Sequence, residues 1–346
     1  MSQPVNQSVN QPVNQYVSQA ANPQATAPAV GSNGKPSFHI AFCVDNNYFR
    51  AMGGTIASII DNNPGQHFTF HVLAFEVSDD HQRRLKQLED MYAVSTQLHL
   101  LDLASFTQFS HFLGHSHYSL SIFTRLVIPT VLQGQTDRVL YLDADILCVN
   151  KLDEMVDMDI SGDIAVVVPD APVTLQRRVA ALGLKHNEYF NGGVIFINIA
   201  KWISEDITQQ TLDALLDSKT DMRFNDQDAL NIVLNGRARY VSPRWNYLYD
   251  LIHDLNVNKF ALRPVGKAVF IHFAGAVKPW TDWSGHDARH LFRKYLSLSP
   301  WSDMPLDPEP KNTKEMRMHS RFMYRQGRPL ESLKWYIRYL RKRAAK

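Results

Sequence analysis

Two aspartates separated by one residue, Asp143 and Asp145, follow the apolar segment VLYL. Side chains of a strand alternate between its two faces, so residues i and i+2 share a face and both carboxylates would be aimed at one point. Like charges held that close repel each other unless a cation lies between them. The pair therefore predicts a divalent-cation site at the end of a buried strand. A simple turn is the competing interpretation, because aspartate is common in turns.

His272 ends a second apolar segment, KAVFIH, and Lys278 follows six residues later. Two carboxylates and an imidazole suit a hard to borderline divalent ion, Mn²⁺ more than zinc, with positions left open for a substrate. Ions held in this way commonly bind phosphate oxygens and stabilise a diphosphate leaving group. Lys278 could add a point charge to the same phosphates, and Gly275 would let the backbone approach a ligand closely. A core histidine and a surface lysine are the structural alternatives.

Other polar residues also stand at the ends of apolar segments. Asp45 and Asp170 follow such segments, and Asn191 precedes two glycines in FNGG. Ligands of open parallel sheets bind beyond the carboxyl ends of the strands, so these side chains are candidates for one site. The segment NDQD opens a helix and would place Asp226 and Gln227 near its positive dipole end. Helix capping by this segment is compatible with such a role.

Elements that could position these residues alternate along the chain. Nearly continuous apolar strands separated by helices predict a parallel sheet covered on both faces. The expected strands are 38–45, 67–75, 97–103, 137–149, 164–172, 192–199 and 267–275. The expected helices are 46–60, 78–92 with a cap at Ser78 or Asp79, 119–132 with Arg125, and 225–236 ended by Gly236.

Composition bounds the class of protein. The chain has 346 residues, 45% of them hydrophobic, enough for a large α/β domain. Residues 1–36 repeat the tripeptide VNQ, so we expect a disordered leader. Apolar runs stay below the roughly 18 residues that span a bilayer, and no secretory signal is visible. Cys43 and Cys148 both lie in apolar segments, which suits a reducing compartment. These features predict a cytoplasmic protein.

Charge is divided unevenly along the chain. Residues 311–346 contain 12 lysines and arginines against two acidic residues, whereas residues 1–310 contain 24 against 32. Apolar residues recur between the basic ones at roughly helical spacing, which is typical of a helix on an anionic membrane surface. A helical pair packed on the body is the structural alternative. We expect no nucleic-acid binding, because the acidic body would repel a duplex.

Six segments, in order, resemble those of the retaining family 8 glycosyltransferases. They are VDNNY (44–48), TRL (124–126), RVLYLDADIL (138–147), YFNGGVIFIN (189–198), NDQDALN (225–231) and IHFAGAVKPW (271–280). Within that family, the chain resembles the bacterial lipopolysaccharide core α-hexosyltransferases. The resemblance implies a GT-A type fold over residues 37–280, with a Rossmann-like, mostly parallel sheet. A basic helical extension would follow over residues 281–346.

The resemblance also implies roles for individual residues. The metal ligands would be Asp143, Asp145 and His272, holding Mn²⁺ or Mg²⁺. The residues binding the UDP-hexose would be Cys43, Asp45, Asn47 and Tyr48 at the uridine, Arg125 and Asn191 at the sugar, Asp143, Ala144 and Asp145 at the metal, and Gly275 and Lys278 at the diphosphate. The candidate catalytic residues are Gln227, Asp226 and Asp170.

The predicted reaction moves glucose or galactose from a UDP-hexose to a hexose of the lipopolysaccharide core, in α-1,3 or α-1,2 linkage. The enzyme would work at the cytoplasmic face of the inner membrane, held there by its basic tail. Because Gln227 stands where a carboxylate nucleophile is expected, a same-face displacement is favoured over a covalent intermediate. Another acceptor, such as a capsular glycan or a protein, and a catalytically silent sugar-nucleotide-binding protein are the alternatives.

Overall fold

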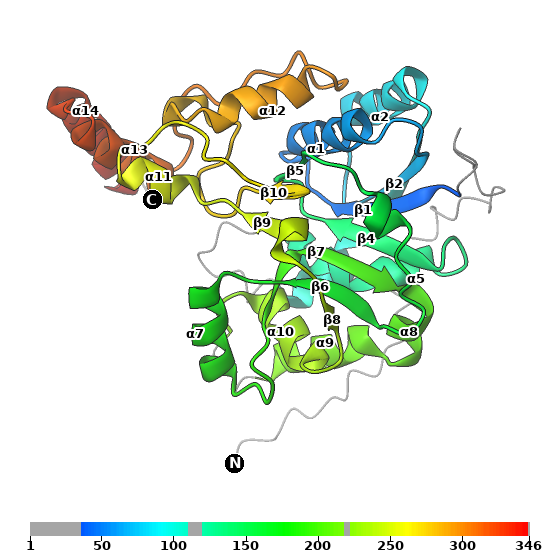
Figure 1. Cartoon of the computed structure of the whole chain (residues 1–346). Coiled ribbons are helices and arrows are strands. Elements are labelled where there is room, and N and C mark those ends of the chain that lie inside the picture. The colour runs from blue at the N-terminus through cyan, green and yellow to red at the C-terminus, as the bar shows by residue number, and fades with distance from the viewer. Residues whose placement is uncertain (1–35, 110–119, 218–221, 345–346) are drawn as a thin grey trace.

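The computed structural model describes residues 36–109, 120–217 and 222–344, so the predicted leader lies outside the described residues except for its last position. A seven-stranded sheet forms the middle of the main body, and helices cover both of its faces (Figure 1). The predicted α/β class is confirmed. The strands of this sheet are β1 (Phe38–Cys43), β2 (Phe68–Ala74), β3 (Ser95–Leu100), β4 (Arg138–Leu142), β6 (Ala165–Pro169), β7 (Phe190–Asn198) and β8 (Arg239–Tyr240).

The order of the strands decides which residues meet at the sheet edge. It is β3-β2-β1-β4-β7-β6-β8, and all neighbours are parallel except β7, which runs antiparallel to both β4 and β6. The sheet is therefore mostly parallel, as predicted, with β7 as the reversed strand. Because β7 is reversed, its first residues lie at the edge where β1, β4 and β6 end. The segment FNGG at its start thus comes beside the polar residues that follow those strands.

Alternation of side chains along the strands gives the sheet two apolar faces. One face includes Ile40, Phe70 and Leu140 and packs under the first helical layer, and the other includes Ala41, Leu73 and Tyr141. The first layer contains α1 (Phe49–Asn62), α2 (Asp79–Met91) and α12 (Ala288–Leu296). The second contains η3 (Leu120–Val127), α5 (Ile128–Leu132), α8 (Ile199–Ser204), α9 (Ile207–Leu216) and α10 (Asn225–Leu234).

Two predicted elements have a different form in the structure. The strand expected over 137–149 is broken, because β4 ends at Leu142 and β5 (Ile146–Cys148) belongs to a second sheet. That sheet has the order β5-β10-β9, with β9 (Tyr247–Leu248) and β10 (Phe270–His272). The helix expected over 119–132 is a 3₁₀ segment, η3, followed by the short α5; residue 119 lies outside the described residues. Pro129 at the start of α5 suits this change of helix type.

Helix ends follow local chemistry. The Ser78 side chain accepts a hydrogen bond from the His81 N–H and caps α2, as predicted. At α10 the N-cap position is Phe224, which makes no side-chain cap, and the Asp228 carboxylate accepts the N–H groups of Arg223 and Phe224. The remaining helices are α3 (Leu103–Phe106), η2 (Thr107–Phe109), α6 (Asp153–Val156), α7 (Pro172–Leu182), η4 (Pro243–Asn246), α11 (Leu251–Asn256) and η5 (Asp282–Ser284).

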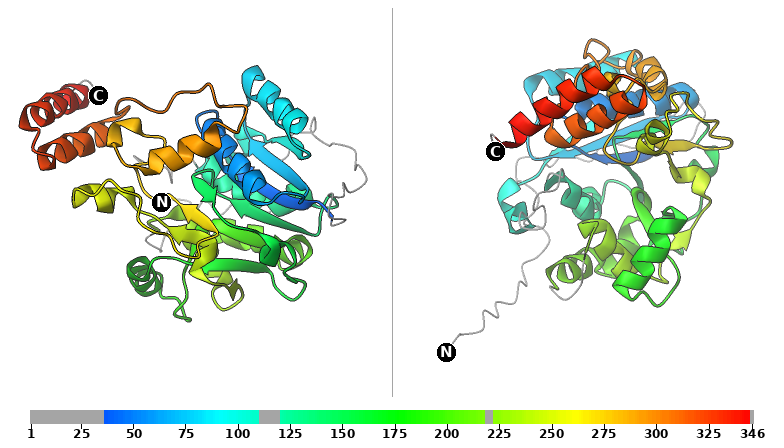
Figure 2. Two further views of the ribbon diagram at one scale, coloured as in Figure 1. Left: turned by 45° about the horizontal axis from the view of Figure 1, so that its top comes forward. Right: turned by 90° about the vertical axis from the view of Figure 1, so that its left-hand side faces the viewer.

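The carboxyl-terminal region divides into a packed segment and a helical hairpin. Trp301 is fully buried, and its ring lies against Gly53 of α1, where a Cβ would come within 2.4 Å of it. Residues on both sides of the predicted border at 280 therefore share one core. Beyond them, α13 (Thr313–Arg325) and α14 (Pro329–Ala344) pack against each other and extend from one side of the body (Figure 2). Phe322 of α13 joins the main core.

Candidate active site

The two aspartates lie in a turn, not in one strand. Asp143 follows β4 and Asp145 precedes β5, while Ala144 between them is buried in the core. The hydroxyl of Thr55, on α1, lies 3.0 Å from the Ala144 carbonyl oxygen and 2.7 Å from that of Ile146. These contacts hold the turn. Because the Ala144 side chain points into the core, the carboxylates of Asp143 and Asp145 point away from it. The predicted convergence of the carboxylates is correct, although its cause is a turn and not a pleat.

His272, the last residue of β10, completes a three-residue cluster with these aspartates. One ligand atom from each residue can be chosen so that all three lie within 4.8 Å of one another. The imidazole Nε2 is 3.3 Å from an Asp145 oxygen and 3.8 Å from an Asp143 oxygen. The three residues come from the break between β4 and β5 and from the small sheet. They are the group among the described residues that could hold a metal ion.

The second nitrogen of His272 is fixed by an asparagine. Nδ1 of His272 lies 2.9 Å from Oδ1 of Asn246, whose Nδ2 donates to Asn191 at 2.9 Å. Because Asn246 Oδ1 can only accept, Nδ1 of the imidazole carries the proton and the lone pair of Nε2 faces the aspartates. An imidazole held in this tautomer is typical of a metal ligand. The donor set of two carboxylates and one nitrogen therefore fits Mn²⁺ or Mg²⁺.

The glycines of FNGG make room for this site. A Cβ on Gly193 would lie 2.4 Å from Cε1 and 2.7 Å from Nδ1 of His272, so the imidazole can rest on β7 only where a side chain is missing. A Cβ on Gly192 would lie 3.0 Å from Arg125. The Gly193 carbonyl also accepts the Asp143 N–H at 2.9 Å. Both glycines thus allow neighbouring side chains to approach the backbone of β7 closely.

Two cations lie between the acidic side chains. Lys278 is paired with Asp145 and donates to the Phe273 carbonyl at 3.0 Å. Burial alone would raise the pKa of Asp145, but Lys278 and His272 hold it well below its usual range. Arg125 lies 3.0 Å from Asp226 and 3.4 Å from Asp143. Lys278, predicted at the diphosphate, therefore lies beside a metal-site carboxylate.

The candidate catalytic residues form a second cluster next to the first. Gln227 donates from Nε2 to Asp170 at 3.1 Å, and its Oε1 accepts the Gly192 N–H at 2.8 Å. Asp170 also accepts from Asn191 at 3.3 Å, and burial raises the pKa of its carboxyl group. Burial raises the pKa of Asp226 to about 6 despite the nearby Arg125. The structure thus brings together four of the predicted residues from β6, β7 and α10.

The turn after β1 carries the residues predicted for the uridine. Asp45 accepts the Asn47 N–H at 2.9 Å, and the Tyr48 ring makes an edge contact with Trp280 at 5.8 Å between centroids. Cys43 lies at the end of β1, where burial raises the pKa of its thiol to about 12, so the thiol stays protonated. Tyr48 lies within electrostatic range of Lys278, Asp145 and Asp143. This turn therefore borders the metal-site cluster.

Gly275 also lies in the surrounding loop, after β10. Its φ is +102°, in the left-handed region that favours glycine, and a Cβ there would approach Asp250 at 3.4 Å. The residue is thus required by the loop conformation that leads from His272 to Lys278. Its position is compatible with the predicted backbone approach to a diphosphate.

Several residues that build the site were not predicted. Thr55 holds the aspartate turn, Asn246 orients His272, and Tyr189 contacts Gln227 at 2.9 Å. Each is a common polar residue inside an apolar or mixed segment, so neither type nor spacing sets it apart. Asp228, which binds Tyr189, was not predicted either. Tyr189 directly precedes FNGG and Asp228 belongs to NDQD, so the two motifs are the signals that could have pointed to these two residues.

A sheet of this topology, with an acidic pair after β4 and sugar-binding candidates at the start of β7, defines a GT-A type glycosyltransferase. The family model for glycosyl transferase family 8 matches residues 39–284, and that for the family's C-terminal part matches residues 287–343. The chain therefore belongs to glycosyl transferase family 8 and is a sugar-transferring enzyme, as predicted.

Similar proteins agree with this assignment. The chain is 30% identical over 314 residues to a lipopolysaccharide 1,3-galactosyltransferase of Salmonella typhimurium, covering 88% of this chain and 91% of the relative. It is 27% identical over 297 residues to a lipopolysaccharide 1,2-glucosyltransferase of Escherichia coli, covering 84% and 87%. The solved structure of the galactosyltransferase LgtC with donor and acceptor sugar analogs has a TM-score of 0.63 at 23% identity, covering 76% of this chain and 96% of that one. This last likeness supports the fold.

Proposed function

We propose that the enzyme transfers glucose or galactose from a UDP-hexose, with retention of configuration, to a hexose of the lipopolysaccharide core. The observation that carries the proposal is the cluster of Asp143, Asp145 and His272 beside Gln227 in a family 8 chain. Relatives named for 1,3-galactosyl and 1,2-glucosyl transfer to lipopolysaccharide support the acceptor class and an α-1,3 or α-1,2 linkage.

The metal would be held by Asp143, Asp145 and His272. A divalent ion bound there would neutralise charge on the diphosphate of the donor. Lys278, paired with Asp145, adds a positive charge at the same place. Gly275 would allow the loop backbone close to that diphosphate. Together these residues would stabilise the leaving UDP.

The donor would extend across the sheet edge from the β1 turn to β7. Its uridine would bind at Cys43, Asp45, Asn47 and Tyr48, in the turn that borders the metal-site cluster. Its hexose would lie near Arg125, Asn191 and Asp226, which surround the start of β7. This arrangement keeps the bond to be broken close to the metal-site cluster.

The contacts of Gln227 favour a same-face displacement. Its amide oxygen accepts from Gly192 and its nitrogen donates to Asp170, and an amide held in this way is a poor nucleophile. Asp226 is paired with Arg125 at 3.0 Å. We therefore propose that the acceptor hydroxyl attacks from the side that UDP leaves and passes its proton to a leaving phosphate oxygen, with Gln227 shielding the opposite side. A glycosylated peptide trapped on Asp226 or Gln227 would contradict this mechanism.

The first test is UDP release from UDP-glucose and UDP-galactose, with and without Mn²⁺. We expect metal-dependent release that prefers one sugar and that falls at least 100-fold in Asp145→Ala, because loss of metal-bound charge stabilisation costs several kcal/mol. The control is Asp90→Ala, an exposed aspartate of α2. Binding of UDP without release, even with truncated lipopolysaccharide present, would favour the catalytically silent reading. Release with transfer only to another glycan or a protein would favour the alternative acceptor.

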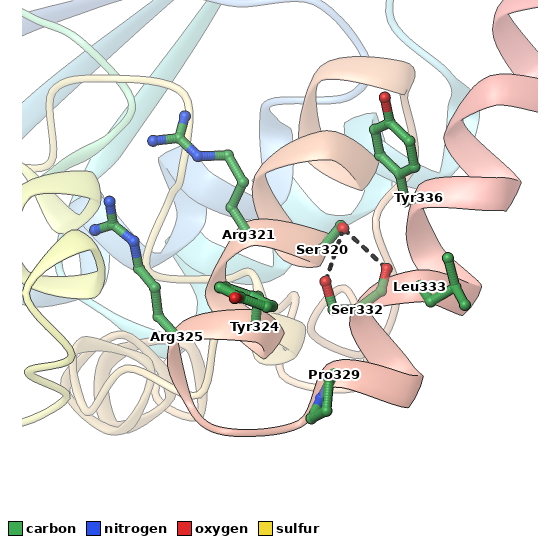
Figure 3. Close-up of a pocket in the computed structure, with 8 residues that line it drawn as sticks. All are labelled: Ser320, Arg321, Tyr324, Arg325, Pro329, Ser332, Leu333 and Tyr336. Carbon is green, nitrogen blue, oxygen red and sulfur yellow. Dashed lines mark hydrogen bonds between the residues drawn. The ribbon is translucent and has the colours of Figure 1, made fainter.

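We also propose that α13 and α14 attach the enzyme to an anionic membrane at the cytoplasmic face of the inner membrane. Within the described part of the chain, no helix has the length and apolarity to span a bilayer. The two helices instead border a hollow of about 610 Å³, lined by Arg321 and Arg325 of α13 and by Leu333 and Tyr336 of α14 (Figure 3). Exposed apolar side chains continue along α14 at Leu330, Ile337 and Leu340.

This attachment is tested by cosedimentation with vesicles of phosphatidylethanolamine containing phosphatidylglycerol. Because α13 packs into the core through Phe322, deleting the tail would disturb the fold, so surface substitutions are preferable. We expect Arg321→Glu and the pair Leu330→Ser with Leu333→Ser each to weaken binding about tenfold and leave UDP release unchanged. Leu103→Ser, at an exposed leucine of α3, is the control. Equal binding by all variants would contradict the role of the hairpin.

A further inference from the structure

A buried network lies behind Gln227, on the side of α7 and β7. Its centre is Asp228, which is fully buried and makes a two-pronged pair with Arg178 at 3.0 and 2.8 Å. The same carboxylate accepts the N–H groups of Arg223 and Phe224 at 2.7 and 2.8 Å. Tyr189 approaches it with its hydroxyl at 2.6 Å. The carboxylate is thus held in one orientation by groups from three segments of the chain.

The donor and acceptor roles in these hydrogen bonds determine how Gln227 is oriented. A carboxylate paired with a guanidinium accepts hydrogen bonds, so the Tyr189 hydroxyl must donate its proton to Asp228. The Tyr189 oxygen is then left as an acceptor, and it lies 2.9 Å from Nε2 of Gln227. The charge of Arg178 therefore decides, through its pair with Asp228 and two further hydrogen bonds, that the amide nitrogen of Gln227 faces Tyr189.

The remaining contacts of Gln227 agree with that orientation. The second hydrogen of Nε2 reaches Asp170 at 3.1 Å, and Oε1 accepts the Gly192 N–H at 2.8 Å. A flipped amide would place its oxygen against the acceptors of Asp170 and Tyr189 and its nitrogen against an N–H donor. Buried polar groups left in such mismatched pairs are costly. The network therefore selects one of the two amide orientations.

We propose that Tyr189, held by Asp228 and Arg178, is a positioning residue that fixes the amide of Gln227 for the transfer step. The inference rests on the role of Gln227 in the proposed function. Tyr189 does not touch the donor in this scheme and acts through Gln227. Removal of the Tyr189 hydroxyl should therefore lower kcat with little change in KM for the UDP-hexose. This effect should vanish when Gln227 is absent.

A double-mutant cycle of Tyr189→Phe and Gln227→Ala tests this dependence. The chain offers a matched control in Tyr249→Phe, because the Tyr249 hydroxyl also donates to a buried aspartate, Asp254, at 2.8 Å, and Arg263 binds that aspartate at 3.0 Å. kcat and KM are measured for UDP release with Mn²⁺, at a temperature well below the melting temperature of every variant. The melting temperatures are measured in parallel to compare the structural cost of the two Tyr→Phe changes.

We expect Tyr189→Phe to lower kcat about tenfold and to change KM less than about twofold, consistent with the loss of one hydrogen bond. In the Gln227→Ala background, Tyr189→Phe should cause no further fall in kcat. Tyr249→Phe should leave kcat unchanged. A tenfold fall in both backgrounds, or an equal fall in Tyr249→Phe, would overturn the inference. Full activity of Gln227→Ala would instead refute the proposed role of Gln227, and no release by the wild type would refute the proposed function.

A second measurement does not depend on turnover. In protein labelled with ¹⁵N-glutamine, the side-chain NH₂ signal of Gln227 is the one missing from Gln227→Ala. We expect this signal to shift in Tyr189→Phe and to stay in place in Tyr249→Phe, because only the first change removes an acceptor of Nε2. An unshifted signal in Tyr189→Phe would contradict the inference even if that variant had lost activity through instability.

Discussion

At the scale of single residues, the site alternates charges of opposite sign. Lys278 lies on Asp145, and Arg125 lies between Asp143 and Asp226. Without these cations the three carboxylates would repel one another across a buried space. A divalent ion and the diphosphate of a sugar nucleotide carry roughly equal and opposite charges. The ion and the diphosphate can therefore bind together without changing the net charge of the site.

Gly193 gives a test of the proposed metal site in which no candidate ligand residue is replaced. In Gly193→Ala the new methyl group would lie 2.4 Å from Cε1 of His272, so the imidazole must move away from Asp143 and Asp145. We expect the affinity for Mn²⁺, measured by electron paramagnetic resonance titration without donor, to fall about tenfold, the lower end for a disturbed outer shell.

The control for this change is Gly162→Ala, because a Cβ on Gly162 meets no atom within 4 Å. It should leave the Mn²⁺ affinity unchanged. Unaltered affinity in Gly193→Ala, in a variant that melts at the wild-type temperature, would show that His272 does not bind the ion.

The members of the proposed metal site could be predicted from the sequence, whereas the residues that hold them in place could not. Asp143 and Asp145 stand out because two carboxylates one residue apart follow an apolar segment, and His272 ends another. Asn246 and Thr55 act through geometry that only the folded chain creates, 26 residues from His272 in one case and 89 residues from Ala144 in the other. No spacing rule links partners that far apart.

At the scale of elements, the first three strands carry a row of histidines across the sheet. His39 on β1 lies 2.8 Å from His71 on β2, and His71 lies 3.0 Å from His99 on β3, measured between ring nitrogens. His71 and His99 are buried. Burial lowers the pKa of His39 and of His99 to about 4 and that of His71 well below 6.5. The row is therefore neutral at physiological pH.

This row makes the stability of the fold sensitive to acid. The unfolded chain takes up protons on these histidines below about pH 6.5, whereas folded His99 does so only near pH 4. The contribution of these histidines to the free energy of unfolding is thus complete above pH 6.5 and is lost as the pH drops toward 4. His99 alone should account for about 1.3 kcal/mol of the loss between pH 7.5 and 5.5. Urea unfolding at both values measures it.

The variant His99→Gln keeps a hydrogen-bonding side chain beside His71 and removes one titrating group. We expect its free energy of unfolding to change less between the two pH values than that of the wild type. His290→Gln, at an exposed histidine of α12, serves as control and should follow the wild type. Identical pH dependence of His99→Gln and the wild type would contradict the role of the row.

Helices and strands were predicted correctly where the apolar residues had a clear periodicity. The prediction failed where a strand breaks without a glycine or proline. The segment that becomes β4 and β5 contains neither glycine nor proline, and its two aspartates suit a turn as well as a cation site, so the local sequence does not decide where β4 ends. The turn forms because Thr55 binds two of its carbonyl groups and Ala144 fits the core. The reversed direction of β7 was equally hidden, since a buried strand reads the same in either orientation.

At the scale of the whole molecule, the carboxyl-terminal segment is part of the catalytic body. Trp301 lies on Gly53 and donates from its indole nitrogen to His81 at 3.1 Å, which ties the segment to α1 and α2. Arg50 of α1 pairs with Asp307 at 3.0 Å in a buried contact. The family resemblance implied only that this segment belongs to a basic helical extension over residues 281–346. The two glycines of α1 have meaning only once the folded chain brings Trp301 against Gly53 and Phe292 against Gly54.

A pair of tryptophan substitutions tests whether body and hairpin unfold as one unit. Trp301→Ala removes a fully buried ring from the main core, and we expect the free energy of unfolding to fall by about 3–5 kcal/mol. Its melting, followed by circular dichroism, should coincide with the loss of UDP release. Trp335→Ala removes a half-buried ring of α14 that packs edge-on against His319, so it should loosen the hairpin and spare UDP release. If Trp301→Ala instead melted in two steps with UDP release retained through the first, the carboxyl-terminal segment would be an independent domain, and the glycines of α1 would need another explanation.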